Sequence, residues 1–221
     1  ALSLAKLRIL TQHKELFRAV QRLIPAEGPA LYDAVFQTDG KYLYYDAKSL
    51  PACFAEDPSA VSRELLHTLL HCLLGHVYRQ AGEPDLWDLA CDITVEGILM
   101  SGPEGQHKAA RQHKAARQEK AARRDANRQS GQKLLQRLEY ERLTQAAGGT
   151  SAPALCRYLT ELRERKEETE ALRELFCRDS HALWYGRDKA QAAGGRTGNR
   201  AERRDGEDAD SLKGKNAAIE E

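Results

Sequence analysis

A leucine-rich segment with two histidines one helical turn apart, residues 64–76, constrains the fold of this chain more than any other feature. At about 100° per residue, its leucines cover roughly half of a helix, and polar residues share the other half. His67 and His71 are four positions apart, so their rings lie one above the other and can converge on one ion. Zinc hydrolases of the H-E-x-x-H type use this spacing, although here Thr68 stands where that motif has its glutamate.

Two histidines at this spacing can also be ordinary boundary residues with hydrogen-bonded rings, and a second segment favours the metal interpretation. Residues 85–100 are almost entirely apolar except for four acids that fall on one helical stripe, Asp85, Asp88, Asp92 and Glu96. A buried carboxylate without a partner is costly, so the stripe needs a counter-charge. A metal ion held by His67 and His71 is one candidate, and the nearby arginines Arg63 and Arg79 are the structural alternative.

The N-terminal region supplies packing elements. Residues 2–24 place leucine and valine at roughly helical intervals among basic residues, which predicts one amphipathic helix closed by Pro25. Two β-prone runs, 31–36 and 41–45, flank the turn pair Asp39-Gly40 and predict a β-hairpin.

Helix-boundary signals surround the histidine segment. Asp57 is an N-cap candidate with Pro58 at the first helical position, and Gly82-Glu83-Pro84 ends the helical run on the other side. Residues 77–79 favour further helix, so His76 should lie on the far side of the helix from His67 and His71, among the leucines. We expect His76 to be structural.

Helical periodicity returns in the C-terminal half after a break at residues 101–105. The runs 134–143 and 155–176 are separated by the loop 148–151 and should pack back on the domain. A compact polar and aromatic cluster follows, with Asp179, His181 and Trp184 as its landmarks. A lone histidine and tryptophan in such a place are typical of structural residues.

Two segments are expected to lie outside the compact core. Residues 107–128 repeat a six-residue unit and carry eight Lys and Arg against two acids, and residues 186–221 have few large apolar side chains. Neither forms a continuous apolar face. His107 and His113 are six apart and would not face one another on a helix. The basic segment suggests nucleic-acid binding as one hypothesis, but it lacks aromatic residues for base stacking, and a solvated surface is the simpler interpretation.

Composition limits the class of protein. With 221 residues of which 30% are charged, the chain is long enough for one good-sized domain with solvated extensions. Its five cysteines show no C-x-x-C pairing, and the N-terminus shows no signal segment, so we expect a reducing, cytoplasmic setting. No apolar run reaches the roughly 18 residues of a membrane span, which argues against a membrane protein.

The ordered set of motifs resembles one bacterial family. It comprises the Asp39-Gly40 turn, the strand 43–45, the His67-x-x-x-His71 helix, the segment 86–92 and the later Asp179-x-His181-x-x-Trp184. The family is the "putative metallopeptidase domain" that precedes a von Willebrand factor A-like domain, and the resemblance covers residues 1–185. It implies a small zincin-like fold of mostly helical α+β class, with the hairpin beside the metal-site helix.

The resemblance also implies a site and partners. His67 and His71 take the role of zinc ligands, Asp92 that of the third ligand, and a peptide would be the substrate. An AAA+ ATPase and the von Willebrand factor A-like domain are the implied partners. That domain is absent from these 221 residues, so whether the chain is a fragment stays open.

The sequence departs from the family pattern at Thr68 and Glu96. A threonine hydroxyl cannot accept a proton from metal-bound water near neutral pH, and Glu96 stands where related sequences often have an amide. Two functional hypotheses remain beside nucleic-acid binding. One is a zinc-dependent peptidase in which Glu64 or Glu96 acts as substitute base. The other is a catalytically silent module, a pseudoenzyme, that keeps the metal or only the fold and serves as an adaptor.

Overall fold

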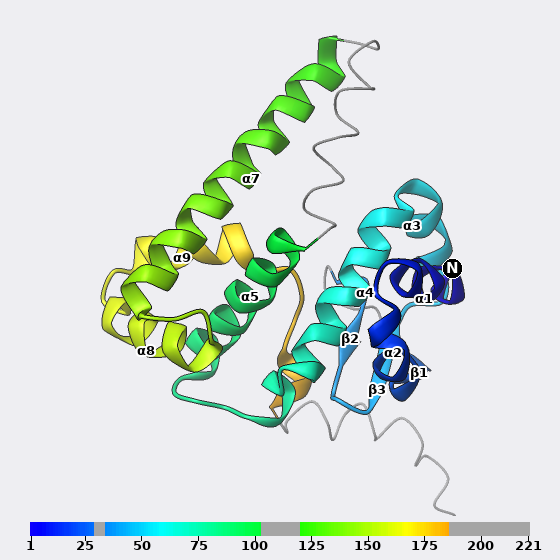
Figure 1. The fold of residues 1–221 in the computed structure, drawn as a ribbon, viewed down its shortest axis with the longest axis horizontal. Helices are drawn as coiled ribbons and strands as arrows, with labels where there is room; N and C mark the ends of the chain where they lie inside the picture. The colour runs from blue at the N-terminus through cyan, green and yellow to red at the C-terminus, as the bar shows by residue number, and fades with distance from the viewer. Residues whose placement is uncertain (29–33, 103–119, 186–221) are drawn as a thin grey trace, which may run out of the picture.

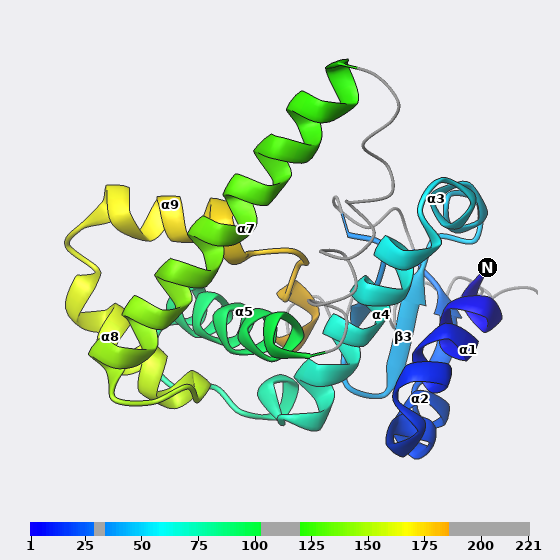
Figure 2. The ribbon, with the colours of Figure 1, turned by 45° about the horizontal axis from the view of Figure 1, so that its top comes forward.

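The computed structural model describes residues 1–28, 34–102 and 120–185, with the side chains of residues 120–129 left out. These residues form a mostly helical α+β fold with one small sheet, which confirms the expected class (Figures 1 and 2). The elements up to residue 102 are α1 (Leu2–Gln12), η1 (Lys14–Leu16), α2 (Phe17–Arg22), β1 (Ile24–Glu27), β2 (Gln37–Thr38), β3 (Tyr42–Tyr45), α3 (Leu50–Glu56), α4 (Pro58–Leu73), η2 (His76–Tyr78) and α5 (Pro84–Ser101). From residue 120 onward the elements are α7 (Lys120–Ala147), α8 (Ala152–Leu162), α9 (Lys166–Phe176) and η3 (Ala182–Trp184).

The N-terminal segment is not the single helix that its periodicity predicts. The chain leaves the helical conformation at His13 (φ −131°) and forms η1 and α2 before entering strand β1. Pro25 lies inside β1 and does not simply close a helix. Among the described strands, β1 pairs only with β3 and lies at the edge of the sheet, where a residue without an N–H donor is tolerated.

A hairpin forms around the expected Asp39-Gly40 turn, but its first strand is Gln37–Thr38 and not the predicted run 31–36. β2 and β3 pair antiparallel, in the register Thr38 opposite Leu43. At the turn, Asp39 Oδ1 accepts hydrogen bonds from the backbone N–H of Lys41 (2.9 Å) and Tyr42 (2.8 Å), and Gly40 adopts φ +89°. Of the expected first strand, residues 34–36 are not extended in the sheet, and residues 31–33 lie outside the described residues.

Helix α4 begins as expected and ends earlier than expected. The Asp57 side chain accepts hydrogen bonds from the backbone N–H of Ser59 (2.8 Å) and Ala60 (2.9 Å), which caps the N-terminus. The helix stops at Leu73, and Gly75 takes a left-handed conformation (φ +75°) that turns the chain into η2. The prediction of further helix through residues 77–79 is therefore wrong, and His76 points back toward α4.

Two groups of buried apolar side chains hold the domain together, and α5 contributes to both. One group joins α1, α2, the hairpin, α3 and α4 and includes Leu43, Leu65, Leu69 and Val95. The other joins α5, α8, α9 and η3 and includes Leu89, Ile93, Leu155 and Phe176. Figures 1 and 2 show α4 and α5 side by side between these two halves. Residues that project between α4 and α5 are thus enclosed by both groups.

The C-terminal helices differ from the expected ones in one respect. The periodic run 155–176 forms two helices, α8 and α9, and not one. The helical conformation is interrupted at residues 163–165, where the backbone N–H of Arg165 donates to the Leu162 carbonyl (2.8 Å). Residues 120–128 of the basic segment begin α7, whereas residues 107–119 and 186–221 lie outside the described residues. Within the described ranges, no helix combines the length and apolar character that crossing a membrane requires.

Candidate metal centre

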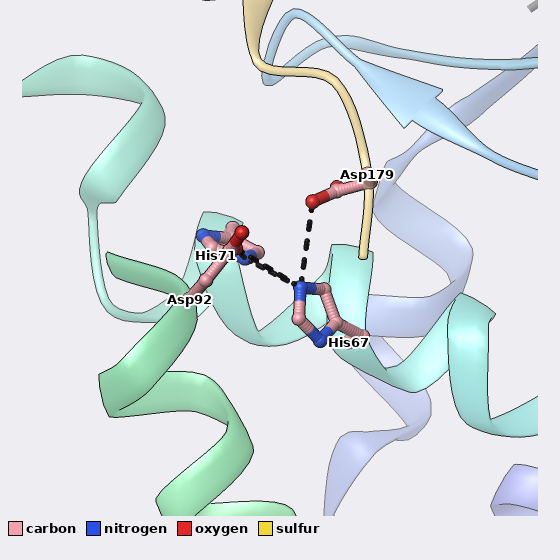
Figure 3. Close-up of side chains that lie close together, drawn as sticks. All are labelled: His67, His71, Asp92 and Asp179. Atoms are coloured by element: carbon pink, nitrogen blue, oxygen red, sulfur yellow. Dashed lines mark hydrogen bonds and ion pairs between the residues drawn. The ribbon is translucent and has the colours of Figure 1, made fainter. Parts of the chain in front are cut away.

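His67 and His71 project from the same face of α4 into the space between α4 and α5. Both side chains are completely buried. Their Nε2 atoms lie 2.9 Å apart, as the i, i+4 spacing predicts. The two rings therefore present their ε nitrogens to one point in the interior (Figure 3).

Asp92 reaches the same point from α5. Its Oδ1 atom lies 3.3 Å from His67 Nε2 and 3.2 Å from His71 Nε2, and its side chain is also fully buried. The acidic stripe divides along its length: Asp88, Asp92 and Glu96 face the interior cluster, whereas Asp85 is largely exposed and lies 4.0 Å from Arg173. The structure thus brings together the three residues that the sequence singled out as metal ligands.

A fourth side chain, Asp179, enters the cluster from the segment after α9. Its Oδ1 atom lies 3.5 Å from His67 Nε2, and each of the four residues His67, His71, Asp92 and Asp179 offers a ligand atom within 4.8 Å of the others. Sequence reasoning missed this residue because nothing local ties it to α4 or α5. The sequence feature that could have indicated Asp179 is the compact polar and aromatic cluster that directly follows the last helical run.

The spacing of these atoms fits a small cation. Ligand atoms at roughly 2.0–2.1 Å from a tetrahedral ion lie about 3.3 Å from one another. The four contacts among the cluster atoms measure 2.9, 3.2, 3.3 and 3.5 Å. Asp92 Oδ2 and Asp179 Oδ1 are buried without a hydrogen-bond partner, which is costly for carboxylate oxygens. The chemistry and the spacing of the donors therefore both suit a metal ion.

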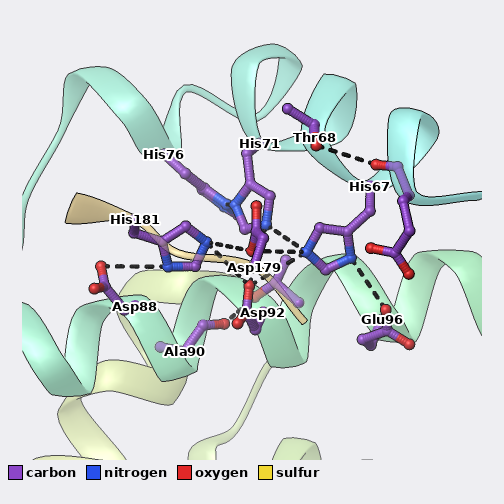
Figure 4. Close-up of polar contacts among 12 residues, drawn as sticks. His67, Thr68, His71, His76, Asp88, Ala90, Asp92, Glu96, Asp179 and His181 are labelled. Carbon is purple, nitrogen blue, oxygen red and sulfur yellow. Dashed lines mark hydrogen bonds and ion pairs between the residues drawn. The ribbon is translucent and has the colours of Figure 1, made fainter. Parts of the chain in front are cut away.

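Outer contacts fix the orientation of both histidines (Figure 4). His67 Nδ1 lies 3.0 Å from Glu96 Oε1, and Glu96 is in turn held by Arg63 and by Gln136 Nε2 (3.2 Å). A carboxylate on the far nitrogen of a histidine is the usual arrangement around a metal ligand. Glu96 therefore lies on the outer side of His67, and the structural alternative of an Arg63 counter-charge holds for Glu96 but not for Asp92.

His76 has the corresponding place behind His71, with the two Nδ1 atoms 3.1 Å apart. Burial and the neighbouring His71 lower the pKa of His76 to about 3, so its ring stays neutral. A neutral His76 can accept a hydrogen bond from His71 Nδ1–H, which leaves the lone pair of His71 Nε2 directed into the cluster.

The carboxylates of the cluster favour a positive charge at the point where the side chains converge. Burial works against a charged His67, yet the nearby carboxylates of Asp179, Asp92 and Glu96 raise its pKa well above the ordinary value. Burial lowers the pKa of His71. A cation held between the two Nε2 atoms would supply positive charge beside the carboxylates of Asp92 and Asp179.

The two candidate substitutes for the missing base are placed differently. Thr68 is buried, and its hydroxyl donates to the backbone carbonyl of Glu64 (3.1 Å). Glu64 itself is half-buried on α4, and burial raises the pKa of its carboxyl group against the opposing charges of His67 and Arg63. Glu96 is committed to His67, Arg63 and Gln136. Of the two, only Glu64 has no such set of fixed partners in the described structure.

The comparison with protein families decides what kind of domain carries this cluster. A family model described as "Putative metallopeptidase domain" matches residues 2–220. The chain belongs to this family. No curated protein and no solved structure matches the chain. Membership of this family agrees with a group of two histidines and two aspartates that could hold a metal ion, with both histidines on the helix where the sequence placed them.

Proposed function

We propose that this domain binds one zinc ion through His67, His71, Asp92 and Asp179, and that the ion has a structural role. The observation that carries the proposal is the convergence of four donors from three separate segments on one point, of which His67, His71 and Asp92 are completely buried and the Asp179 side chain is 6% exposed. Two imidazole nitrogens and two carboxylate oxygens at these spacings are donors that zinc accepts, whereas calcium and magnesium prefer sites made entirely of oxygen.

The number of donors supports a structural role over a hydrolytic one. Structural zinc sites are closed by four protein ligands, whereas catalytic sites keep one position open for water or substrate. Three ligands with an open position were the expectation from sequence, and Asp179 supplies the fourth donor. Thr68 adds to this argument because its hydroxyl is bonded to the helix backbone and cannot serve as a base.

A bound zinc ion would supply positive charge at a point where two carboxylates are buried. The residues of the chain do the remaining work. Glu96 and His76 hold the two histidine rings in position, and α4 and α5 enclose the cluster. The donors of α4, of α5 and of the segment after α9 would then be joined at one point, which stabilises contacts between parts of the chain that are distant in sequence.

The metal content of the purified protein tests the proposal directly. We expect about one zinc per chain in untagged protein that is purified without chelator or added metal, measured by elemental analysis. Removal of the ion by a strong chelator should lower the thermal midpoint, and added zinc should restore it. Less than about a tenth of an equivalent of any transition metal, with none gained on dialysis against zinc, would refute the proposal.

A metal-dependent peptidase is the second candidate function, and Glu64 is the observation that favours it. Burial raises the pKa of its carboxyl group, while the charges of His67 and Arg63 oppose that rise, so the group lies near the cluster. Under the structural proposal, we expect no zinc-dependent cleavage of casein or of a mixed peptide library. Cleavage that is lost both with chelator and in Glu64→Gln, while that variant keeps its zinc, would establish the peptidase instead.

The family resemblance also suggests that the domain has protein partners. A structural ion suits an adaptor that works with an AAA+ ATPase and a von Willebrand factor A-like domain, since such a role needs a rigid surface and no base. Nucleic-acid binding through residues 107–128 is the weaker alternative. Salt-dependent gel shifts with the full chain would separate it from the adaptor role.

A further inference from the structure

His181 lies in the turn between α9 and η3, beside the cluster described above. Its side chain is 2% exposed. The ring stacks on Trp184, with centroids 3.9 Å apart and an angle of 28° between the planes. Figure 4 shows the ring directed toward Asp92 and Asp179. The expectation that this histidine and tryptophan are only structural does not account for that direction.

The ε nitrogen of His181 is aimed at the same carboxylates as the ligand histidines. His181 Nε2 lies 2.9 Å from Asp179 Oδ1 and 3.3 Å from Asp92 Oδ1. It is buried and has no hydrogen-bond partner of acceptable geometry. A buried imidazole nitrogen in this state is either strained or directed at something that is not part of the chain.

The outer side of His181 repeats the arrangement of His67. His181 Nδ1 faces Asp88 Oδ1 at 3.6 Å, as His67 Nδ1 faces Glu96, and Asp88 also accepts a hydrogen bond from the Tyr185 hydroxyl. Asp88, Asp92 and Glu96 follow one another at four-residue steps along α5. The middle acid therefore faces the point of convergence, while each flanking acid supports one histidine.

We propose that His181 is a further ligand of the same ion, so that three histidines and two aspartates surround it. The inference rests on the proposed metal site and extends it by one residue. It gives the segment after α9 two donors, Asp179 and His181, and so makes the ion the attachment point of this segment to α4 and α5. The ion would then have five protein donors, one more than the four that usually close a structural zinc site, a coordination number that zinc reaches in some catalytic sites.

Cobalt(II) in place of zinc provides a readout that responds to ligands and not to packing alone. The full chain is loaded with one equivalent of Co²⁺, and its visible absorption spectrum is recorded for wild type, His181→Ala and Trp184→Phe. We expect His181→Ala to change the position and intensity of the cobalt bands and to weaken zinc binding by about a hundredfold or more, beyond the range of an outer contact. Trp184→Phe alters the stacking but no donor, so it should keep the wild-type spectrum.

Rescue by free imidazole separates a lost ligand from a lost packing contact. Imidazole added to Co²⁺-loaded His181→Ala should restore the wild-type spectrum, because the small ring can fill the space and supply the missing nitrogen. A cobalt spectrum that is the same in wild type and His181→Ala would overturn the inference. So would two ions per wild-type chain, since the proposal is for a single ion. A wild-type chain that takes up no metal at all would instead refute the proposed site itself.

Discussion

Replacing His71 with alanine is expected to reduce bound zinc from about one equivalent per chain to under about a tenth. His71 Nε2 faces both His67 Nε2 (2.9 Å) and Asp92 Oδ1 (3.2 Å), so the substitution removes the donor nearest the middle of the cluster. At a zinc concentration of about a thousand times its Kd, the wild-type chain should gain about 4 kcal/mol, or roughly 10 °C in Tm. The variant should gain nothing. Elemental analysis and thermal unfolding with and without zinc measure both effects.

The His71→Ala substitution also leaves a cavity that lowers Tm by itself, so the effect of zinc has to be separated from the effect of the cavity. The Tm of each protein is therefore compared between its own metal-free and zinc-loaded forms, since the cavity is present in both forms of the variant. His13→Ala is the matched control, because His13 lies at the end of α1, away from the cluster, and its ring pairs with the nearby Glu15. A His71→Ala protein that keeps a full equivalent of zinc and the same rise in Tm would show that His71 is not a ligand.

The local parts of this structure could be predicted from the sequence because their causes are local. The Asp57 cap, the Asp39-Gly40 turn and the convergence of His67 with His71 each depend on residues within one or two turns of each other. A different argument predicted that the acidic stripe of α5 has a partner, because a buried carboxylate without one is costly. The choice of Asp92 among these acids came from the family resemblance and not from a physical rule.

The parts that sequence could not supply depend on tertiary contacts. β1 and β3 pair in parallel, but the sequence of β1 does not show the alternation of apolar and polar residues that predicts a strand. Pro25 within β1 instead suggested the end of a helix. Asp179 and His181 lie far along the chain from α4 and α5, and only the packing of α9 against α5 brings them to the cluster. The sequence around an acid and a histidine in a loop does not indicate which site in the fold they belong to.

The end of α4 was misjudged for a related reason. Residues 77–79 suit a helix by propensity, but Gly75 adopts a left-handed conformation that is available to glycine at little cost. The turn that follows places His76 behind His71, not among the leucines on the far face. Propensity is a weak guide at such a position, because the burial of Val77 and His76 decides the path of the chain.

Asp92→Asn is expected to weaken zinc binding by at least about a hundredfold, and His76→Gln by no more than about tenfold. Asp92 Oδ1 is within 3.3 Å of the ε nitrogens of His67, His71 and His181, so its charge lies at the centre of the donor set. The asparagine keeps the shape but loses that charge. His76 acts only through His71 Nδ1, and the amide oxygen of a glutamine can still accept that hydrogen bond.

Competition with a zinc chelator of known affinity measures both variants on one scale, and thermal unfolding of the metal-free proteins reports their packing. Metal-free His76→Gln should lose stability, since a buried ring is replaced by a smaller and more flexible side chain. Metal-free Asp92→Asn removes a carboxylate that faces three imidazoles, so its Tm reports how much of the metal-free stability depends on that charge. If His76→Gln loses zinc more severely than Asp92→Asn, then the turn at Gly75 makes His76 a ligand, and Asp92 is a partner of the histidine rings and not of the ion.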